Sequence, residues 1–182
     1  MKTIKTLLTI AAFVIGSLPL LAQEHRVSPH ATFSAAADDN RVTVIYGRPY
    51  TKNPRTGEVR KIWGGLVPYG KVWRTGADEA TLLITQKPLV FGSTTVPAGC
   101  YTLYTLPNED GTAKLIINKA IGQWGTDYDE SQDLARIDLK KSTLDKSVDQ
   151  FTMTIDKGTD GGEVLNLSWE NTEYGASFTV QK

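Results

Sequence analysis

FTMTIDKGTDGGEVLNLSWE, residues 151–170, contains two segments in which apolar and polar residues alternate, joined by a run rich in glycine and aspartate. Positions 151, 153 and 155 are apolar in the first segment, and positions 165, 167 and 169 are apolar in the second. Successive side chains of a strand point to opposite faces, so this alternation places one face in a core and the other in water. Glycine and aspartate adopt the backbone of tight turns at low cost. The stretch therefore predicts an antiparallel hairpin.

The same period of two recurs along most of the chain. Residues 42–46 and 176–180 alternate in the same way, Leu82 and Ile84 are expected to share one buried face, and Ile116 and Ile117 to be buried on both sides. Turn-forming runs at 38–40 and 107–111 separate the strands, and the ambiguous segment 131–141 is interpreted as a short turn leading into a strand. These patterns predict an all-β protein, an antiparallel β-sandwich or a barrel-like variant of it, with little helix.

Residues 48–80 interrupt this pattern and predict one long irregular connection. Within it, residues 61–81 read KIWGGLVPYGKVWRTGADEAT, with aromatic, charged and glycine residues crowded together. Connections longer than about 12–15 residues are uncommon in compact domains, and many are functional. The connection is therefore either a flap that closes one end of the sandwich or a binding surface.

The candidate binding surface uses aromatic side chains as stacking faces and charged side chains as polar contacts. The guanidinium of Arg74 can hold a carboxylate with two hydrogen bonds, and Asp78 or Glu79 could equally be its internal partner. Both alternatives stay open from sequence. The six candidate residues are Arg48, Trp63, Tyr69, Trp73, Arg74 and Glu79.

A catalytic alternative is a hydrolase that acts on a glycan or a peptide with Glu79 as acid or base. A hydrolytic pair needs two carboxylates that face each other across the scissile bond. Asp78 and Glu79 are adjacent, and on a strand their side chains would point to opposite faces. The sequence identifies no second acid for Glu79.

Metal and cofactor motifs are weak in this sequence. Residues 127–133 alternate oxygen ligands as a calcium loop does, but Gln132 stands at the turn position that needs glycine, so a solvated acidic loop is favoured. The single cysteine, Cys100, lies in a strand-like run and is interpreted as a small buried apolar residue. We expect no metal and no cofactor.

The N-terminus predicts a secretory signal peptide over residues 1–22, which leaves a single domain over residues 23–182. Lys2 and Lys5 precede an apolar run that ends at Leu21, and Ala22 is a small residue before the expected cleavage site. The run is shorter than the ~20 residues of a membrane span, and no later segment is apolar enough, so we expect export to the periplasm or the medium. The full chain has 20 basic and 20 acidic residues, which argues against a nucleic-acid partner.

Several short motifs are spread over the chain from about Ser28 to the C-terminus. They are SP at 28–29, YGRP at 46–49, LVPYG at 66–70, VWRTGA at 72–77, EAT at 79–81, PAG at 97–99, YTL at 101–103 and SWE at 168–170. Together these motifs resemble an exported bacterial family known as domain of unknown function 2911. The resemblance implies an exported β-rich domain from bacteria of the Bacteroidetes type, with no established activity, substrate or catalytic residue. The family commonly has Asn where this chain has Asp78, and Thr or Ser where it has Cys100.

Together these patterns favour a non-catalytic module that binds a small molecule, a glycan or a peptide through the connection. The hydrolase is one alternative, and a purely structural or partner-docking module is the other, which buried aromatic residues would favour. The oligomeric state and the ligand do not follow from the sequence.

Overall fold

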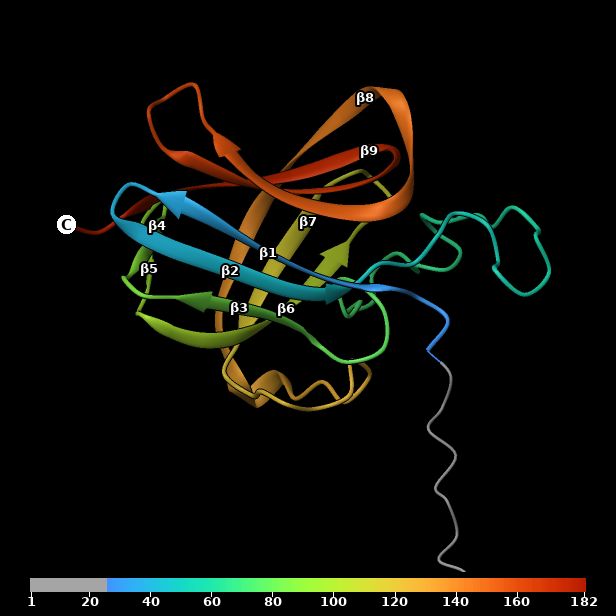
Figure 1. Ribbon diagram of the computed structural model, residues 1–182, viewed down its shortest axis with the longest axis horizontal. Helices are drawn as coiled ribbons and strands as arrows, with labels where there is room; N and C mark the ends of the chain where they lie inside the picture. Colours follow the sequence, from blue (N-terminus) through green and yellow to red (C-terminus); the bar gives the residue numbers. More distant parts are fainter. Residues whose placement is uncertain (1–25) are drawn as a thin grey trace, which may run out of the picture.

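The computed structural model describes residues 26–182, and the predicted signal peptide lies outside them (Figure 1). Regular structure in this part of the chain consists of strands and one 3-10 turn. They are β1 (His30–Ala37), β2 (Asn40–Gly47), β3 (Thr81–Thr85), β4 (Leu89–Phe91), β5 (Thr94–Val96), β6 (Gly99–Pro107), β7 (Ala113–Asn118), η1 (Glu130–Gln132), β8 (Asp133–Lys157) and β9 (Glu163–Val180).

All nine strands belong to one antiparallel sheet in the order β1-β2-β3-β6-β7-β8-β9-β4-β5. β1 and β5 are the two ends of this order, and within residues 26–182 they do not pair with each other, so the sheet stays open. The prediction of an all-β antiparallel fold with little helix is confirmed. None of the described residues forms an apolar helix of the length that a bilayer crossing needs.

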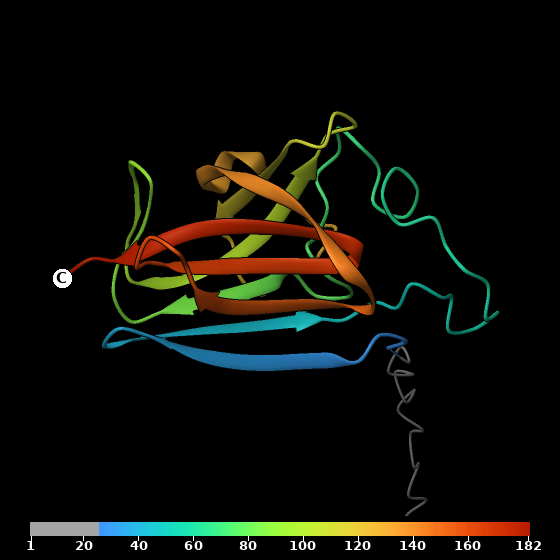
Figure 2. The same ribbon diagram turned by 90° about the horizontal axis from the view of Figure 1, so that it is seen from above.

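The long pair β8 and β9, which we call the ribbon, turns back on itself and covers the rest of the sheet. β8 changes register against β9 between residues 143 and 152, and Glu170 opposite this region has a left-handed backbone (φ 51°). Gly175 lies beyond the bend, and a Cβ added to it would be 3.0 Å from Cγ1 of Val164, which lies eleven positions earlier on β9. The two halves of β9 are therefore folded against each other. The wide orange bend at the upper right of Figure 1 is where β8 turns, and Figure 2 shows the layers from above. This bend gives the single sheet its sandwich form.

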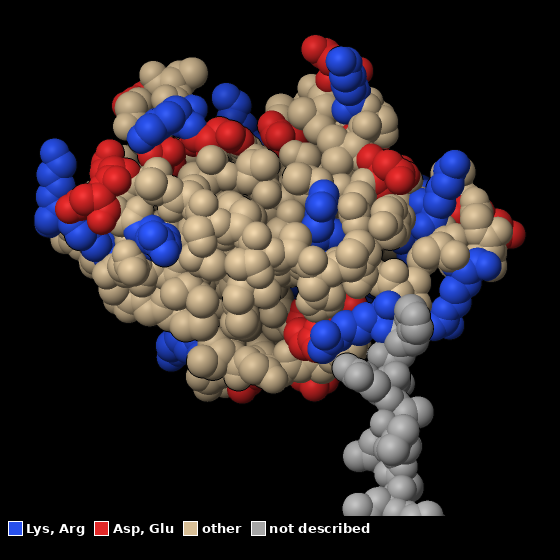
Figure 3. Space-filling model, viewed as in Figure 1, with Lys and Arg blue, Asp and Glu red and all other residues tan. Residues whose placement is uncertain are grey.

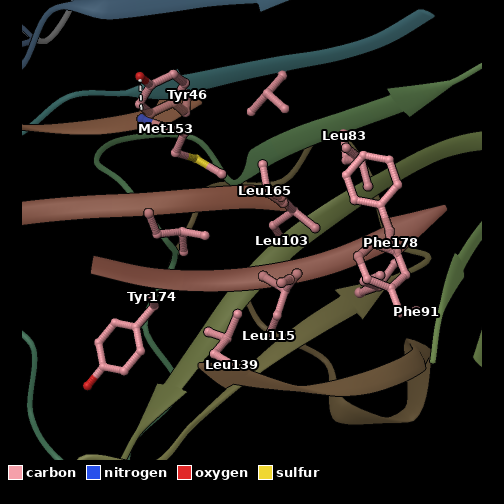
Figure 4. Packing of buried hydrophobic residues seen from close by; sticks show 14 of the residues in the cluster. Tyr46, Leu83, Phe91, Leu103, Leu115, Leu139, Met153, Leu165, Tyr174 and Phe178 are labelled. Carbon is pink, nitrogen blue, oxygen red and sulfur yellow. Dashed lines mark hydrogen bonds between the residues drawn. The ribbon is translucent and has the colours of Figure 1, made fainter. Parts of the chain in front are cut away.

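The core lies between the ribbon and strands β2, β3, β6 and β7 (Figure 4). Alternate residues from both layers meet there, as the period of two predicts, and Trp169 has no exposed surface. The Tyr46 hydroxyl accepts a hydrogen bond from the Met153 amide across 2.9 Å, which ties β2 to the ribbon inside the core. The rings of Tyr46 and Phe151 meet edge to face at 5.8 Å. Apolar burial of this kind contributes about 25 cal/mol per Å².

The expected buried face of β3 is wrong by one residue. Leu83 is buried, whereas Leu82 is half-buried and Ile84 is 36% exposed. Leu83 pairs with Val44 on one side and with Tyr101 on the other, and both neighbours point into the core. Three consecutive apolar residues allow either register, so the neighbouring strands and not the local pattern decide which face is buried.

The segment 131–141 is a short turn followed by a strand, as predicted. The turn η1 is a single 3-10 turn, and β8 begins directly after it at Asp133. Its N-cap is Asp129, whose carboxylate accepts hydrogen bonds from the Ser131 amide at 2.9 Å and hydroxyl at 2.7 Å. A capping aspartate satisfies an amide that has no partner inside the turn.

Candidate functional site

The connection, residues 48–80, leaves the end of β2, pairs briefly with the ribbon and returns to β3 along the end of the sandwich (Figure 1). The Phe151 amide donates to the Pro49 carbonyl at 2.9 Å, and the Thr51 amide donates to the Asp149 carbonyl at 2.7 Å. Residues 52–59 then project from the body as a small loop closed by the Gly57 amide on the Asn53 carbonyl. This projecting loop carries Lys and Arg side chains on the face shown in Figure 3.

Trp73 anchors the connection to the core. Its amide and its carbonyl each bond with the backbone of Thr105 in β6, both at 2.8 Å. Its ring stacks on Trp169 at 5.8 Å with 21° between the planes, and it meets Phe151 edge to face at 5.0 Å. Only 9% of Trp73 is exposed. One face of the predicted stacking platform is therefore already occupied by the protein's own tryptophan.

Trp63 and Tyr69 are half-buried and support the return path of the connection. Trp63 meets Tyr174 edge to face at 5.3 Å and Trp73 at 6.2 Å, and its buried Nε1 has no acceptor. The Tyr69 ring covers Gly64, where an added Cβ would lie 2.6 Å from Cε2 of the ring. Gly64 also has a φ of 75°, so both space and backbone favour glycine there.

A strained turn places residues 74–79 against the end of β2. Thr75 has a left-handed φ of 51°, which is unusual for a β-branched residue. It is fully buried, its hydroxyl bonds that of Thr105 at 2.7 Å, and its carbonyl accepts from Thr81 Oγ1 at 2.8 Å. Gly47 lies so close to Ala77 that an added Cβ would approach the Ala77 carbonyl carbon to 2.8 Å.

Arg74 does not pair with a carboxylate of its own turn. Its Nη1 donates to the backbone carbonyl of Asp78 at 3.3 Å, and its side chain lies against Gly125, where an added Cβ would come within 2.5 Å of Arg74 Cδ. The internal Arg74–carboxylate pair that the sequence offered as one alternative is not formed. The backbone carbonyl neutralises no charge, so the guanidinium keeps its charge without a counter-ion from the turn.

Asp78 and Glu79 converge instead on His30 at the start of β1. His30 Nε2 lies 3.1 Å from Asp78 Oδ2 and 3.5 Å from Glu79 Oε2, and Glu79 Oε1 also pairs with Arg26. The expectation that the two carboxylates point to opposite faces is wrong, because Asp78 has a left-handed φ of 64° and is not part of a strand. This cluster fixes the N-terminal segment against the turn.

Arg48 serves as a tether to the ribbon. Its Nε donates to the Phe151 carbonyl at 3.1 Å, and its Nη2 donates to Thr152 Oγ1 at 2.7 Å. The Gln150 side chain in turn donates to the Arg48 carbonyl at 3.0 Å. With these bonds the Arg48 guanidinium is engaged by the ribbon, which leaves it fewer donors for a ligand.

A cavity of about 240 Å³, which we call the connection pocket, opens between the connection and the ribbon. Trp73 and Arg74 both contribute to its wall, and so does Trp169, on which the Trp73 ring stacks. It is lined by Pro49, Arg60, Leu66, Trp73, Arg74 and Trp169, together with residue 28 and the turn 76–78. Two of the six predicted residues therefore line one hollow, and the other four lie outside its wall.

Residues 28–178 match the family described as protein of unknown function (DUF2911). The chain belongs to this family. The match runs from just before β1 almost to the end of β9, so the DUF2911 domain includes nearly the whole sheet, the connection and the pocket wall. Neither a curated protein nor a solved structure matches the chain. The family description assigns no activity.

Eight of the ten residues that line this DUF2911 pocket are absent from the six predicted site residues, and the two with unpaired buried donors are Arg60 and Trp169. Arg60 donates from Nη2 to the Tyr50 carbonyl, its Nε is buried without an acceptor, and burial lowers its pKa. Trp169 follows the alternation of apolar and polar residues in β9, and this pattern predicts a core residue and no contact with a ligand. A signal for Trp169 existed in the SWE motif of the family resemblance, whereas Arg60 stands in a charged run that gives no such signal.

The acidic loop of the DUF2911 domain is occupied by its own hydrogen bonds. Asp133 accepts from the Tyr128 hydroxyl at 2.6 Å and pairs with Arg136 at 2.7 Å, and burial together with this bond to Asp133 raises the pKa of Tyr128 to about 12. No group of three His, Cys, Asp or Glu side chains in the described part of the chain is placed to hold a metal ion. Cys100 is a half-buried free thiol whose pKa is raised by burial.

Proposed function

We propose that this domain is exported and acts as a non-catalytic binding module, with the connection pocket as its ligand site. The observation that carries the proposal is a hollow lined by Trp73, Arg74 and Arg60 at the place where the sequence predicts a binding surface. Pockets that combine aromatic walls with a few polar groups are typical of small-molecule sites. The left-handed Thr75 supports the proposal, because backbone strain of this kind concentrates at functional sites.

The dimensions of the pocket limit the ligand. Its volume of about 240 Å³ is slightly below the range of typical small-molecule sites, which span roughly 300–1,000 Å³. A single ring or a short chain fits such a space, so a glycan or a peptide would be held by one terminal unit. The stacked rings of Trp73 and Trp169 in its wall are held by the core and require little reordering on binding, which favours affinity.

The test is a thermal-shift screen of small molecules, sugars and short peptides, followed by a blocking variant. Leu66 is 43% exposed and lines the pocket, so Leu66→Trp should fill its mouth without disturbing the core. Val59 is 73% exposed on the projecting loop, and Val59→Trp is the matched control. Compounds that stabilise the wild type should fail with Leu66→Trp and succeed with Val59→Trp. A panel without stabilising compounds, or stabilisation that persists in Leu66→Trp, contradicts the proposal.

A hydrolase remains the second candidate, because the carboxylates of Asp78 and Glu79 share His30 Nε2. Against it stands the pairing of Glu79 with Arg26 and His30, because these contacts engage the carboxylate within the protein. For a hydrolase, Glu79→Gln should lower turnover of a glycan or peptide substrate by about 100-fold or more. The binding module predicts no turnover in either protein and unchanged ligand affinity in Glu79→Gln.

A structural or partner-docking module is favoured by one specific observation, the burial of Trp73 in the core. In that case the connection is a flap whose aromatic residues only stabilise the end of the sandwich. The blocking variant separates the two proposals, because a flap has no ligand for Leu66→Trp to exclude.

A further inference from the structure

The wall of the connection pocket has positive charges without counter-ions. Arg60 and Arg74 both line it, and neither forms an ion pair in residues 26–182. The one carboxylate of the wall, Asp78, already faces His30 Nε2 at 3.1 Å. A half-buried guanidinium is usually paired, because removing an unpaired charge from water is costly. With two guanidinium groups and one carboxylate, the wall has an excess of positive charge beside an open space.

The same wall has N–H donors without acceptors. Trp169 has no exposed surface and its Nε1 has no acceptor, and the buried Nε of Arg60 has none either. A buried donor that loses its bond to water and gains no other is destabilising by about 1–3 kcal/mol. The two residues that carry these donors, one on the ribbon and one on the connection, both line the pocket. The protein itself therefore leaves two N–H donors of the pocket-lining residues without an acceptor.

From this excess of cationic and N–H donors we infer that the connection pocket binds a small organic carboxylate. The inference rests on the proposed function and names its ligand class. The carboxylate oxygens accept from Arg60, Arg74 and the Trp169 indole, and the rest of the molecule lies against Trp73 and Leu66. Two guanidinium groups and one carboxylate give the wall a formal net charge of one positive unit, which a ligand with a single negative charge balances. A dianion would exceed this charge and would be repelled more strongly by Asp78.

Entry of this ligand requires a small movement at the mouth of the pocket. The unpaired N–H groups of Arg60 and Trp169 are covered by neighbouring atoms, so an acceptor reaches them only when a wall side chain shifts. Leu66 is the most exposed apolar residue of the wall and lies on the connection, not on the sheet. Rotation of an exposed leucine is fast compared with ligand exchange.

The test uses the indole signals of the protein. The chain has four tryptophans, so a ¹⁵N-labelled sample gives four indole Nε1–H signals. The signal that is lost in Trp169→Phe belongs to Trp169. Benzoate with benzamide and glucuronate with glucose are matched acid and neutral probes, titrated at constant ionic strength. We expect the Trp169 Nε1–H signal to shift with at least one acid and not with its neutral partner.

Variants of two arginines complete the test. Arg60→Met should weaken binding of the responding acid by about tenfold or more, since it removes a charged hydrogen-bond donor. Arg55 is exposed on the projecting loop outside the pocket, so Arg55→Met should stay within about twofold of the wild type. An equal loss in both variants would mean general charge attraction and would overturn the inference.

The outcomes also separate this inference from the proposed function. If acid and neutral probes shift the Trp169 signal equally, the pocket binds ligands but has no preference for a carboxylate, and only the present inference is overturned. If no probe shifts the signal and the screen of the previous section also finds nothing, both are overturned.

Discussion

The ribbon and the connection meet at the pocket, but they are built by different means. The ribbon places its side chains through a repeating backbone ladder of β8 on β9, and most of its core residues follow the period of two. The described part of the connection forms only isolated bridges and no repeating ladder, so single backbone bonds, such as those between Trp73 and Thr105, share the task of holding it with side-chain contacts. These contacts are Trp73 on Trp169, Thr75 on Thr105 and Arg48 on Thr152. A ladder tolerates the loss of one side chain better than a chain segment held by single contacts.

This difference in construction explains why the ribbon and the connection have different roles at the pocket. The ribbon supplies a rigid base, and the connection supplies the charged and aromatic wall that faces it. Functional residues are commonly carried by loops that a stable scaffold positions.

Trp73→Ala should have the largest effect on stability. It removes a nearly buried ring that contacts both Trp169 and Phe151, and losses of this kind cost about 3–5 kcal/mol. Denaturant unfolding measures the change. Trp124→Ala is the control, because Trp124 is 40% exposed, and it should cost about 1 kcal/mol or less. Equal effects of the two variants would remove the distinction between an anchored connection and an ordinary loop.

Gly47→Ala should destabilise the contact between β2 and the connection. The added methyl group would collide with the backbone of Ala77, and overpacking of this kind costs about 2–3 kcal/mol. Gly92→Ala is the comparison, because Gly92 has a φ of 58° and open space around its Cα, so only the backbone strain of about 1 kcal/mol applies. If thermal unfolding ranks Gly92→Ala as the more damaging change, the connection is not packed on β2 as described.

Arg48→Met should loosen the connection from the ribbon. It removes the donors to the Phe151 carbonyl and to Thr152 Oγ1, and hydrogen bonds from charged groups are worth about 1.5–3 kcal/mol. We expect a loss of about 2 kcal/mol in urea unfolding, with the exposed Arg55→Met within about 0.5 kcal/mol of the wild type. An Arg48→Met protein that keeps its stability but no longer binds ligand would instead show that Arg48 contacts the ligand, as the sequence predicts.

Glu170→Gln should have the smallest effect, and the effect should depend on pH. Burial at the bend of the ribbon raises the pKa of Glu170 above its usual value. A carboxyl group with a raised folded-state pKa stabilises the fold at low pH, and this contribution is lost as the pH rises through that pKa. Glu170→Gln should therefore raise the melting temperature slightly at pH 7, by less than about 2 °C, and leave it unchanged near pH 4. A larger gain at pH 4 than at pH 7 would show the opposite sign.

Most of the sheet could be predicted from the sequence because its strands are exposed on one face. Alternation at Leu165, Leu167 and Trp169 gives the buried face directly, and the glycine-rich turn after Lys157 gives the hairpin. β3 could not be placed correctly, because its run of apolar residues fits two registers. The bend at Glu170 could not be predicted either, since glutamate rarely adopts a left-handed backbone and only the neighbouring layer requires it there.

The site was predictable as a region but not as a set of contacts. Crowded aromatic and charged residues marked the connection, and Trp73 and Arg74 do line a pocket. The sequence did not predict the contacts of the charged side chains. Arg74 donates to a backbone carbonyl, and Asp78 and Glu79 contact His30 of β1, which is distant in the sequence. These pairs depend on three positive φ values within residues 75–78, and the sequence does not predict a positive φ at Thr75 or Asp78.

Native-state hydrogen exchange of the Trp73 amide tests most directly whether the connection is an integral wall of the pocket. This amide donates to the Thr105 carbonyl at 2.8 Å in the middle of the anchored segment. The structure predicts that it exchanges only with global unfolding, which is also the expected behaviour of the amides of the buried strand residues Leu115 and Ile117 in β7. Exchange as fast as that of the Gly57 amide in the projecting loop would contradict the account, because the wall of the proposed ligand site would then open independently of the sandwich.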